Sequence, residues 1–147
     1  SVFGFDSFQG FPHATSCDMI DGTVPSSSNS KYFAGTSENE VRDFFRTLSL
    51  HDRIMVIPGF FGNTLPKSPV KLISLLILDC DLYESYRTCL EYLYPKVQED
   101  GWIILDEYFS PKYPGARIAV DEFFLTNLKN PDLLSIYLQS IPTNAGT

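Results

Sequence analysis

The chain contains four short runs of apolar residues, and an acidic residue directly follows three of them. The runs cover residues 2–5, 53–57, 71–78 and 101–105. Runs of this length, bounded by turn residues, are typical of β-strands. The run KLISLLIL (residues 71–78) is nearly all apolar, which predicts a central strand buried on both faces, as in a parallel sheet covered by helices.

Segments with helical periodicity lie between these runs. We expect helices over about residues 38–49, 83–97 and 115–128, the first opened by a capping box from Ser37 to Glu40. The Gly-, Pro- and Ser-rich residues 7–30 and the turn-rich residues 60–69 predict loops. Residues 133–139 suggest a final strand. Alternating strands and helices predict an α/β fold with a mostly parallel sheet.

The size and charge of the chain narrow the classes of protein to consider. Its 147 residues are enough for a single domain, and 18 acidic against 11 basic residues give a net charge of -7. Such a surface repels phosphate backbones and anionic lipids, so we expect no nucleic-acid or membrane partner. There is no apolar run of the roughly 20 residues that span a bilayer, and the first residues lack a signal-peptide layout. We therefore expect a soluble, cytoplasmic protein.

The cysteines do not indicate a disulfide framework or a zinc site. Cys17, Cys80 and Cys89 are odd in number and have no Cys-x-x-Cys spacing. We expect them to be buried free thiols.

Acidic residues gather where the predicted strands end. Asp6 follows the first strand, Asp79 and Asp81 follow the third, and Asp106 and Glu107 follow the fourth. In open α/β sheets ligands bind beyond the carboxyl ends of the strands, so these acids are expected to face one crevice. Oxygen ligands favour Mg²⁺, Mn²⁺ or Ca²⁺ over zinc. A single such acid can simply face water, but two pairs after two buried strands favour a metal site.

Six motifs occur in order along the chain and together resemble one enzyme family. They are FDSFQGFP (residues 5–12), GFFGNTLP (59–66), DCDLYES (79–85), LYP (93–95), GWIILDEY (101–108) and AVDEF (119–123). The set spans about residues 2–124 and resembles the macrocin O-methyltransferase (TylF) family, which includes sugar O-methyltransferases of macrolide and novobiocin biosynthesis. The resemblance implies a Rossmann-like class I methyltransferase fold. It also implies S-adenosylmethionine as methyl donor, a divalent metal, usually Mg²⁺, and a sugar or secondary-metabolite hydroxyl as acceptor.

The resemblance also implies roles for individual residues. Asp79 matches a metal ligand, Asp106 and Glu107 match the pair that completes the metal site, and Asp81 matches the proposed general base. A metal-bound hydroxyl loses its proton more readily, and a neighbouring carboxylate can accept that proton. The residues expected at the cofactor are Asp6, Ser7, Gly59 and Phe60. From their positions beside the acids and at the start of the last helix, Tyr83 and Arg117 are candidate substrate contacts.

Two departures from the family pattern are visible. Glu107 stands where the family has a second aspartate, and it is one methylene longer. The family's first strand and Gly-rich loop are also absent, because the chain opens on what matches the second strand. We therefore expect a single, partial methyltransferase domain, truncated at its N-terminus. Its uncovered strand edges predict self-association into a homo-oligomer.

The sequence is also compatible with two other functions. A truncated methyltransferase fold can act as a non-catalytic binding module, which the absent Gly-rich loop favours. A strand running into Asp79-Cys80-Asp81, with Asp106-Glu107 as a later acidic pair, also resembles haloacid-dehalogenase-type phosphatases. Those enzymes have Thr or Val where this chain has Tyr83, and their motif lies near the N-terminus rather than at mid-chain.

Overall fold

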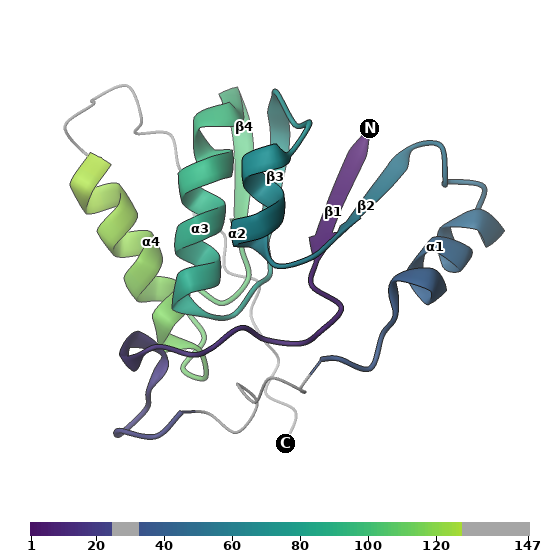
Figure 1. The fold of residues 1–147 in the computed structure, drawn as a ribbon. Helices are drawn as coiled ribbons and strands as arrows, with labels where there is room; N and C mark the ends of the chain where they lie inside the picture. Colours follow the sequence, from purple (N-terminus) through teal and green to yellow (C-terminus); the bar gives the residue numbers. More distant parts are fainter. Residues whose placement is uncertain (25–32, 128–147) are drawn as a thin grey trace, which may run out of the picture.

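Strands and helices alternate along the chain in a computed structural model that describes residues 1–24 and 33–127 (Figure 1). The strands are β1 (Val2–Asp6), β2 (Ile54–Pro58), β3 (Ile73–Leu78) and β4 (Val97–Leu105). The α-helices are α1 (Glu38–Thr47), α2 (Phe61–Thr64), α3 (Tyr83–Leu93) and α4 (Pro114–Asn127). Short 3-10 turns are η1 (Ser16–Asp18), η3 (Leu65–Lys67) and η4 (Tyr94–Lys96). The α/β class is confirmed, and the strand expected at 133–139 lies outside the described residues.

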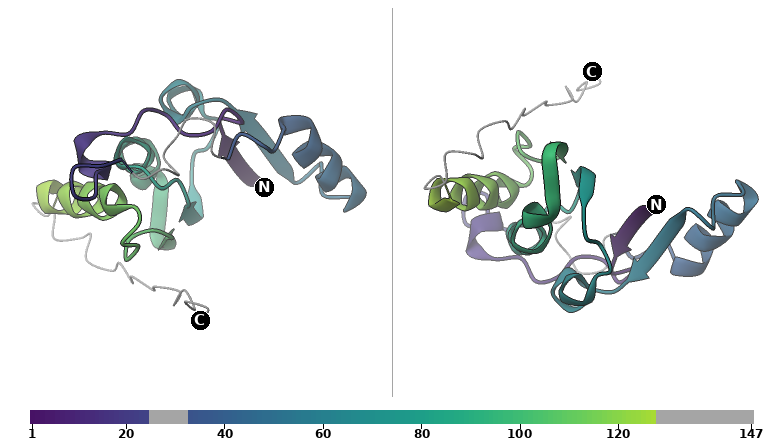
Figure 2. Two further views of the ribbon diagram at one scale, coloured as in Figure 1. Left: turned by 90° about the horizontal axis from the view of Figure 1, so that it is seen from below. Right: turned by 90° about the horizontal axis from the view of Figure 1, so that it is seen from above.

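The strands form two parallel pairs. β1 pairs with β2, with Val2 opposite Ile54, and β3 pairs with β4, with Leu78 opposite Leu105. Across the molecule the order is β4, β3, β1, β2, as both views of Figure 2 show. Within the described residues, no hydrogen-bonded pairing joins β1 to β3. The expected parallel strands are therefore present as two separate sheets.

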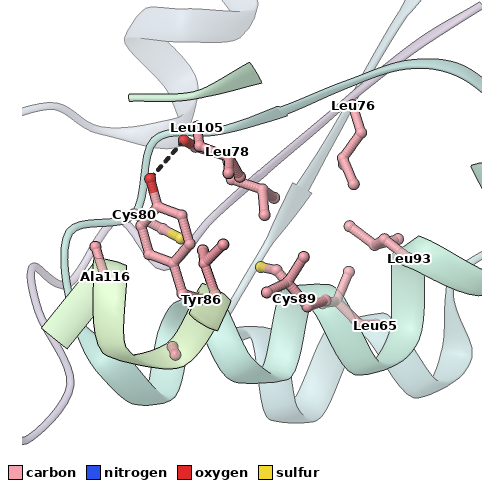
Figure 3. Close-up of a cluster of buried hydrophobic side chains, with 12 residues drawn as sticks. Leu65, Leu76, Leu78, Cys80, Tyr86, Cys89, Leu93, Leu105 and Ala116 are labelled. Carbon is pink, nitrogen blue, oxygen red and sulfur yellow. Dashed lines mark hydrogen bonds between the residues drawn. The ribbon is translucent and has the colours of Figure 1, made fainter. Parts of the chain in front are cut away.

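The hydrophobic core lies between the β3–β4 pair and helix α3, with α4 packed against α3. Figure 3 shows Leu76 and Leu78 of β3 directed towards Tyr86, Cys89 and Leu93 of α3. Alternate residues of a strand point to opposite faces, so this one face of β3 supplies the core. The core thus fixes the end of β3, where Asp79 follows, relative to the start of α3.

The expectation that residues 71–78 are buried on both faces was wrong. Leu75 is 52% exposed and its register partner Trp102 is 57% exposed, and Ile77 is exposed as well. The described helices α3 and α4 both lie on the opposite side of β3 and β4, as Figure 2 shows. An apolar strand sequence alone does not tell whether one face or two are covered.

Local signals set most element boundaries. The capping box of α1 is formed, with Ser37 Oγ accepting from the Glu40 N–H and Glu40 accepting from the Ser37 N–H. The helix expected to reach residue 97 ends at Leu93, because Pro95 has no N–H to continue it. The strand expected from Gly101 begins earlier, at Val97, through an irregular register. Helix α2 and turn η3 were missed because each is a single short turn.

The three cysteines are free thiols, as expected, but they are not all buried. Cys80 and Cys89 are buried, whereas Cys17 is only half-buried. Burial raises the pKa of the Cys80 thiol well above its ordinary value, so this thiol stays neutral.

Among the described residues, no helix has the length and apolar character to cross a bilayer.

Candidate active site

A cavity of about 460 Å³ opens at the carboxyl ends of β1, β2 and β3. Its lining includes all four residues expected at the cofactor and two of the acids: Asp6, Ser7, Gly59, Phe60, Asp79 and Asp81. This volume is in the range of small-molecule sites, which run from about 300 to 1,000 Å³. The two strand pairs therefore bring residues that are more than 70 positions apart in the chain to one cavity.

Backbone hydrogen bonds join the tips of β1 and β2 on one side of the cavity. The Gly59 N–H donates to the Asp6 carbonyl oxygen over 2.8 Å, and the Asp6 carboxylate accepts the Phe8 N–H over 2.6 Å. Gly59 has φ +129°, and a Cβ there would lie 3.0 Å from Cγ2 of Thr64. Glycine is needed at this position because a side chain would both strain the backbone and crowd α2.

Three carboxylates meet on the other side, where β3 and β4 end. Asp79 follows β3, and Asp106 and Glu107 follow β4, whose last residue is opposite that of β3. The Asp106 N–H donates to the Leu78 carbonyl oxygen over 3.0 Å and extends the pairing by one residue. One carboxylate oxygen from each acid lies within 4.8 Å of the other two. Asp79 and Asp106 are exposed, whereas Glu107 is 5% exposed.

Burial and neighbouring negative charges make ionisation of Asp79 and Glu107 unfavourable. Burial raises the pKa of Glu107 to about 8, assisted by a hydrogen bond with Asp106 and the charges of Asp81 and Asp79. Burial and the charge of Asp106 also raise the pKa of Asp79. Desolvated like charges are relieved by a proton or by a bound cation. Three carboxylate oxygens at this spacing are a donor set suited to a hard divalent cation.

Asp81 stands beside this trio on the turn between β3 and α3. It has φ 59°, a left-handed conformation that aspartate tolerates better than most residues. Burial raises the pKa of Asp81 to about 6, with a further contribution from the charge of Asp79 and an opposing one from Lys112. Its carboxylate therefore lines the cavity as a stronger base than an ordinary aspartate.

Asp18 is a site-supporting residue that the sequence analysis missed. It is 1% exposed, and its carboxylate accepts the Tyr83 N–H over 2.8 Å and the Thr15 N–H over 2.7 Å. These bonds tie the loop after β1 to the first residue of α3, just beyond Asp81. A Cβ at Gly115 would lie 2.0 Å from Asp18 Oδ1, so only glycine fits there. The Thr15-x-x-Asp18 spacing of a capping box was the available signal.

The two candidate substrate contacts have other partners. The Tyr83 hydroxyl donates to Glu122 Oε2 over 2.6 Å. Arg117 lies 3.5 Å from the Asp121 carboxylate and stacks over the Tyr108 ring. Neither residue is in the lining of the cavity described above. The structure therefore does not bring these two side chains together with the acids.

The raised pKa values predict how stability varies with pH. In the folded chain Asp81 keeps its proton up to about pH 6 and Glu107 keeps its proton up to about pH 8, whereas the unfolded chain has released both protons above about pH 4–5. The free energy of unfolding therefore falls as pH rises from about pH 4 to about pH 8, by on the order of a few kcal/mol in total. Urea unfolding at pH 5, 6.5 and 8 in EDTA measures it, and Glu107→Gln should flatten the slope. Stability that rises from pH 6.5 to 8 would contradict the prediction.

Parallel strands with a cavity at their carboxyl ends define the chain as a Rossmann-like α/β protein. Solved methyltransferases share this fold. The O-methyltransferase NovP superposes with a TM-score of 0.72 and 36% identity, over 86% of this chain and 52% of NovP. The calicheamicin methyltransferase CalS11 superposes with a TM-score of 0.67 and 25% identity, over 82% and 50%. A profile of the macrocin O-methyltransferase (TylF) family matches residues 1–140. The chain belongs to this family.

Curated relatives point the same way. The chain is 36% identical to demethyldecarbamoylnovobiocin O-methyltransferase of Streptomyces niveus, over 84% of this chain and 47% of the relative. It is 33% identical to mycinamicin III 3''-O-methyltransferase of Micromonospora griseorubida, over 84% and 48%. The chain thus spans about half the length of the curated relatives it matches. With the family established, the phosphatase alternative loses its basis.

Proposed function

We propose that this protein transfers a methyl group from S-adenosylmethionine to a hydroxyl of a sugar or other secondary metabolite, assisted by a divalent cation such as Mg²⁺. The observation that carries the proposal is the shared cavity. Asp6, Ser7, Gly59 and Phe60 line it together with Asp79 and Asp81, so a donor and an acceptor bound there are neighbours. The relatives are named as O-methyltransferases of demethyldecarbamoylnovobiocin and of mycinamicin III, and these names support the acceptor class.

The donor fits the side of the cavity formed by β1 and β2. The Asp6 carboxylate can accept hydrogen bonds from the ribose hydroxyls, and the ring of Phe60 offers an apolar surface for the adenine. Gly59 leaves room for close approach of the ligand to the backbone. S-adenosylmethionine carries its methyl group on a sulfonium, which leaves as a neutral thioether after transfer.

The acids at the tips of β3 and β4 fit the cation. Asp79, Asp106 and Glu107 would hold it through carboxylate oxygens. The raised pKa values of Asp79 and Glu107 are the expected result of assembling such ligands without a cation. A bound Mg²⁺ would polarise the acceptor hydroxyl and fix its direction.

Asp81 is the proposed general base. As the acceptor oxygen forms its bond to the methyl carbon and the carbon–sulfur bond breaks, the hydroxyl proton passes to the Asp81 carboxylate. A pKa of about 6 leaves Asp81 mostly ionised at neutral pH and more basic than an ordinary aspartate. The left-handed turn that holds Asp81, closed by the Asp18 contact to α3, sets its position.

Titration of S-adenosylhomocysteine into this chain by calorimetry tests the proposal. We expect binding to the wild type, and a loss of about tenfold or more in Asp6→Ala, because a charged hydrogen bond contributes about 1.5–3 kcal/mol. Asp52→Ala is the matched control, since Asp52 lies at an exposed turn outside the cavity lining. Absence of binding to the wild type would favour a non-catalytic module. Demethyldecarbamoylnovobiocin, named for the Streptomyces niveus relative, is the acceptor probe for activity assays.

A further inference from the structure

Tyr86 joins the two strand tips that carry the acids. Its side chain is 0% exposed in the core beneath them, and its hydroxyl lies 2.9 Å from the Leu78 carbonyl oxygen, the bond drawn in Figure 3. The same hydroxyl lies 2.7 Å from Oε2 of Glu107 and accepts the Glu107 N–H over 3.2 Å. One oxygen atom therefore contacts the end of β3 and both the backbone and the side chain of Glu107.

On the basis of the proposed function, we propose that Tyr86 is a positioning residue for the metal centre: its hydroxyl holds the Glu107 carboxylate beside Asp79 and Asp106. Tyr86 itself does not touch the cation. It acts through Glu107, the member of the trio that is buried and therefore within reach of the core.

The length of the glutamate side chain explains why such a partner is needed. Glu107 has one more rotatable bond than an aspartate, and fixing a free glutamate side chain costs conformational entropy. A hydroxyl that already holds one carboxylate oxygen removes part of this cost before a cation arrives. Partners of this kind around metal ligands typically change affinity by about 10- to 100-fold.

Tyr86 can donate its hydroxyl proton to Glu107 without leaving the Leu78 carbonyl oxygen without a hydrogen bond. A phenol has a single proton to donate, and two acceptors lie within reach of Tyr86, Leu78 O and Glu107 Oε2. The Leu78 carbonyl oxygen also accepts the Asp106 N–H over 3.0 Å. It therefore keeps a partner when the Tyr86 proton points to Glu107.

Direct measurement of Mn²⁺ binding to the full 147-residue chain tests the proposal. Tyr86→Phe keeps the buried ring and removes only the hydroxyl, and we expect it to weaken Mn²⁺ binding by about 10- to 100-fold. Tyr92→Phe is the control, because Tyr92 is on the same helix with its side chain exposed. We expect its affinity to stay within about twofold of the wild type. Equal affinity of the wild type and Tyr86→Phe would overturn the proposal.

A double-mutant cycle separates positioning from a purely structural effect. If Tyr86 acts through Glu107, Tyr86→Phe has little further effect on Mn²⁺ affinity in a Glu107→Asp background. The shorter aspartate side chain is not expected to reach the Tyr86 hydroxyl, so removing that hydroxyl changes little. Independent, additive effects on affinity would mean that Tyr86 does not work through Glu107. Thermal unfolding of each variant in EDTA records the structural contribution separately.

A second readout keeps the proposal testable if Tyr86→Phe fails to fold. Addition of Mg²⁺ to the wild type is expected to change the ultraviolet absorbance of a buried tyrosine, and the change is expected to vanish in Glu107→Asp. An unchanged wild-type spectrum at saturating Mg²⁺ would overturn the proposal. A wild type that binds no Mn²⁺ would overturn the metal-assisted function as well, whereas a wild type that binds Mn²⁺ independently of Tyr86 overturns only the role of Tyr86.

Discussion

Asp79→Asn is expected to abolish divalent-metal binding, with at least a roughly hundredfold loss of Mn²⁺ affinity and a matching loss of methyl transfer. Asparagine has nearly the same shape but offers a neutral amide oxygen in place of a carboxylate. Only two carboxylate ligands, those of Asp106 and Glu107, then remain to bind the divalent cation. The measurements are Mn²⁺ titration and the rate with the novobiocin-type acceptor probe.

The same substitution is expected to act in the opposite direction on stability. Burial and the charge of Asp106 raise the pKa of Asp79, so its ionised form is unfavourable in the metal-free fold. Asp79→Asn removes this repulsion and should leave the chain in EDTA at least as stable as the wild type. EDTA should also reduce the wild-type rate to that of the variant. Retained Mn²⁺ affinity in Asp79→Asn would contradict the assignment of this residue as a ligand.

Asp81→Asn is expected to lower the rate of methyl transfer by about 10²- to 10⁴-fold, because the acceptor hydroxyl loses its base. Affinity for Mn²⁺ and for S-adenosylhomocysteine should stay within a few fold, since Asp81 is outside the trio of metal ligands. The wild-type rate should rise with pH and level off by about pH 6, where Asp81 is ionised without a cation, or at lower pH because a bound cation favours the ionised carboxylate.

The pH profile distinguishes a base from a structural residue. The rising limb is expected at or below about pH 6 in the wild type and absent from the residual activity of Asp81→Asn. A variant that loses activity only through weaker Mn²⁺ binding, with its pH profile unchanged, would show that Asp81 supports the metal site instead. Asp52→Asn, at an exposed position, provides the control for the loss of one carboxylate.

The sequence predicted those features of the protein that are set by residues close together in the chain. The apolar runs gave the strands, the capping box gave the start of α1, and the acids at the ends of the runs were recognised as a potential metal site. These signals work because strand and helix propensity, capping and turn formation involve residues a few positions apart. The ordered motifs also predicted the family, which is confirmed.

Long-range contacts were not predictable in the same way. Asp18 bonds to the Tyr83 N–H across 65 positions of sequence, and Tyr86 reaches Glu107 across 21. Tyr83 was expected near a substrate, but its hydroxyl contacts Glu122 on α4, 39 positions away. The orientation of a polar side chain depends on which partner the packed helices bring within reach.

The sequence by itself therefore determined the order of strands and helices, the acids at the strand ends and the family. The tertiary structure alone decided which face of β3 is buried, that one cavity joins Asp6 with Asp79, and that Tyr86 supports Glu107. The physical reason is that local structure follows from short-range backbone preferences and hydrophobic periodicity. The packing of β3 against α3, and every contact that depends on it, follows from surfaces that meet only when the chain is folded.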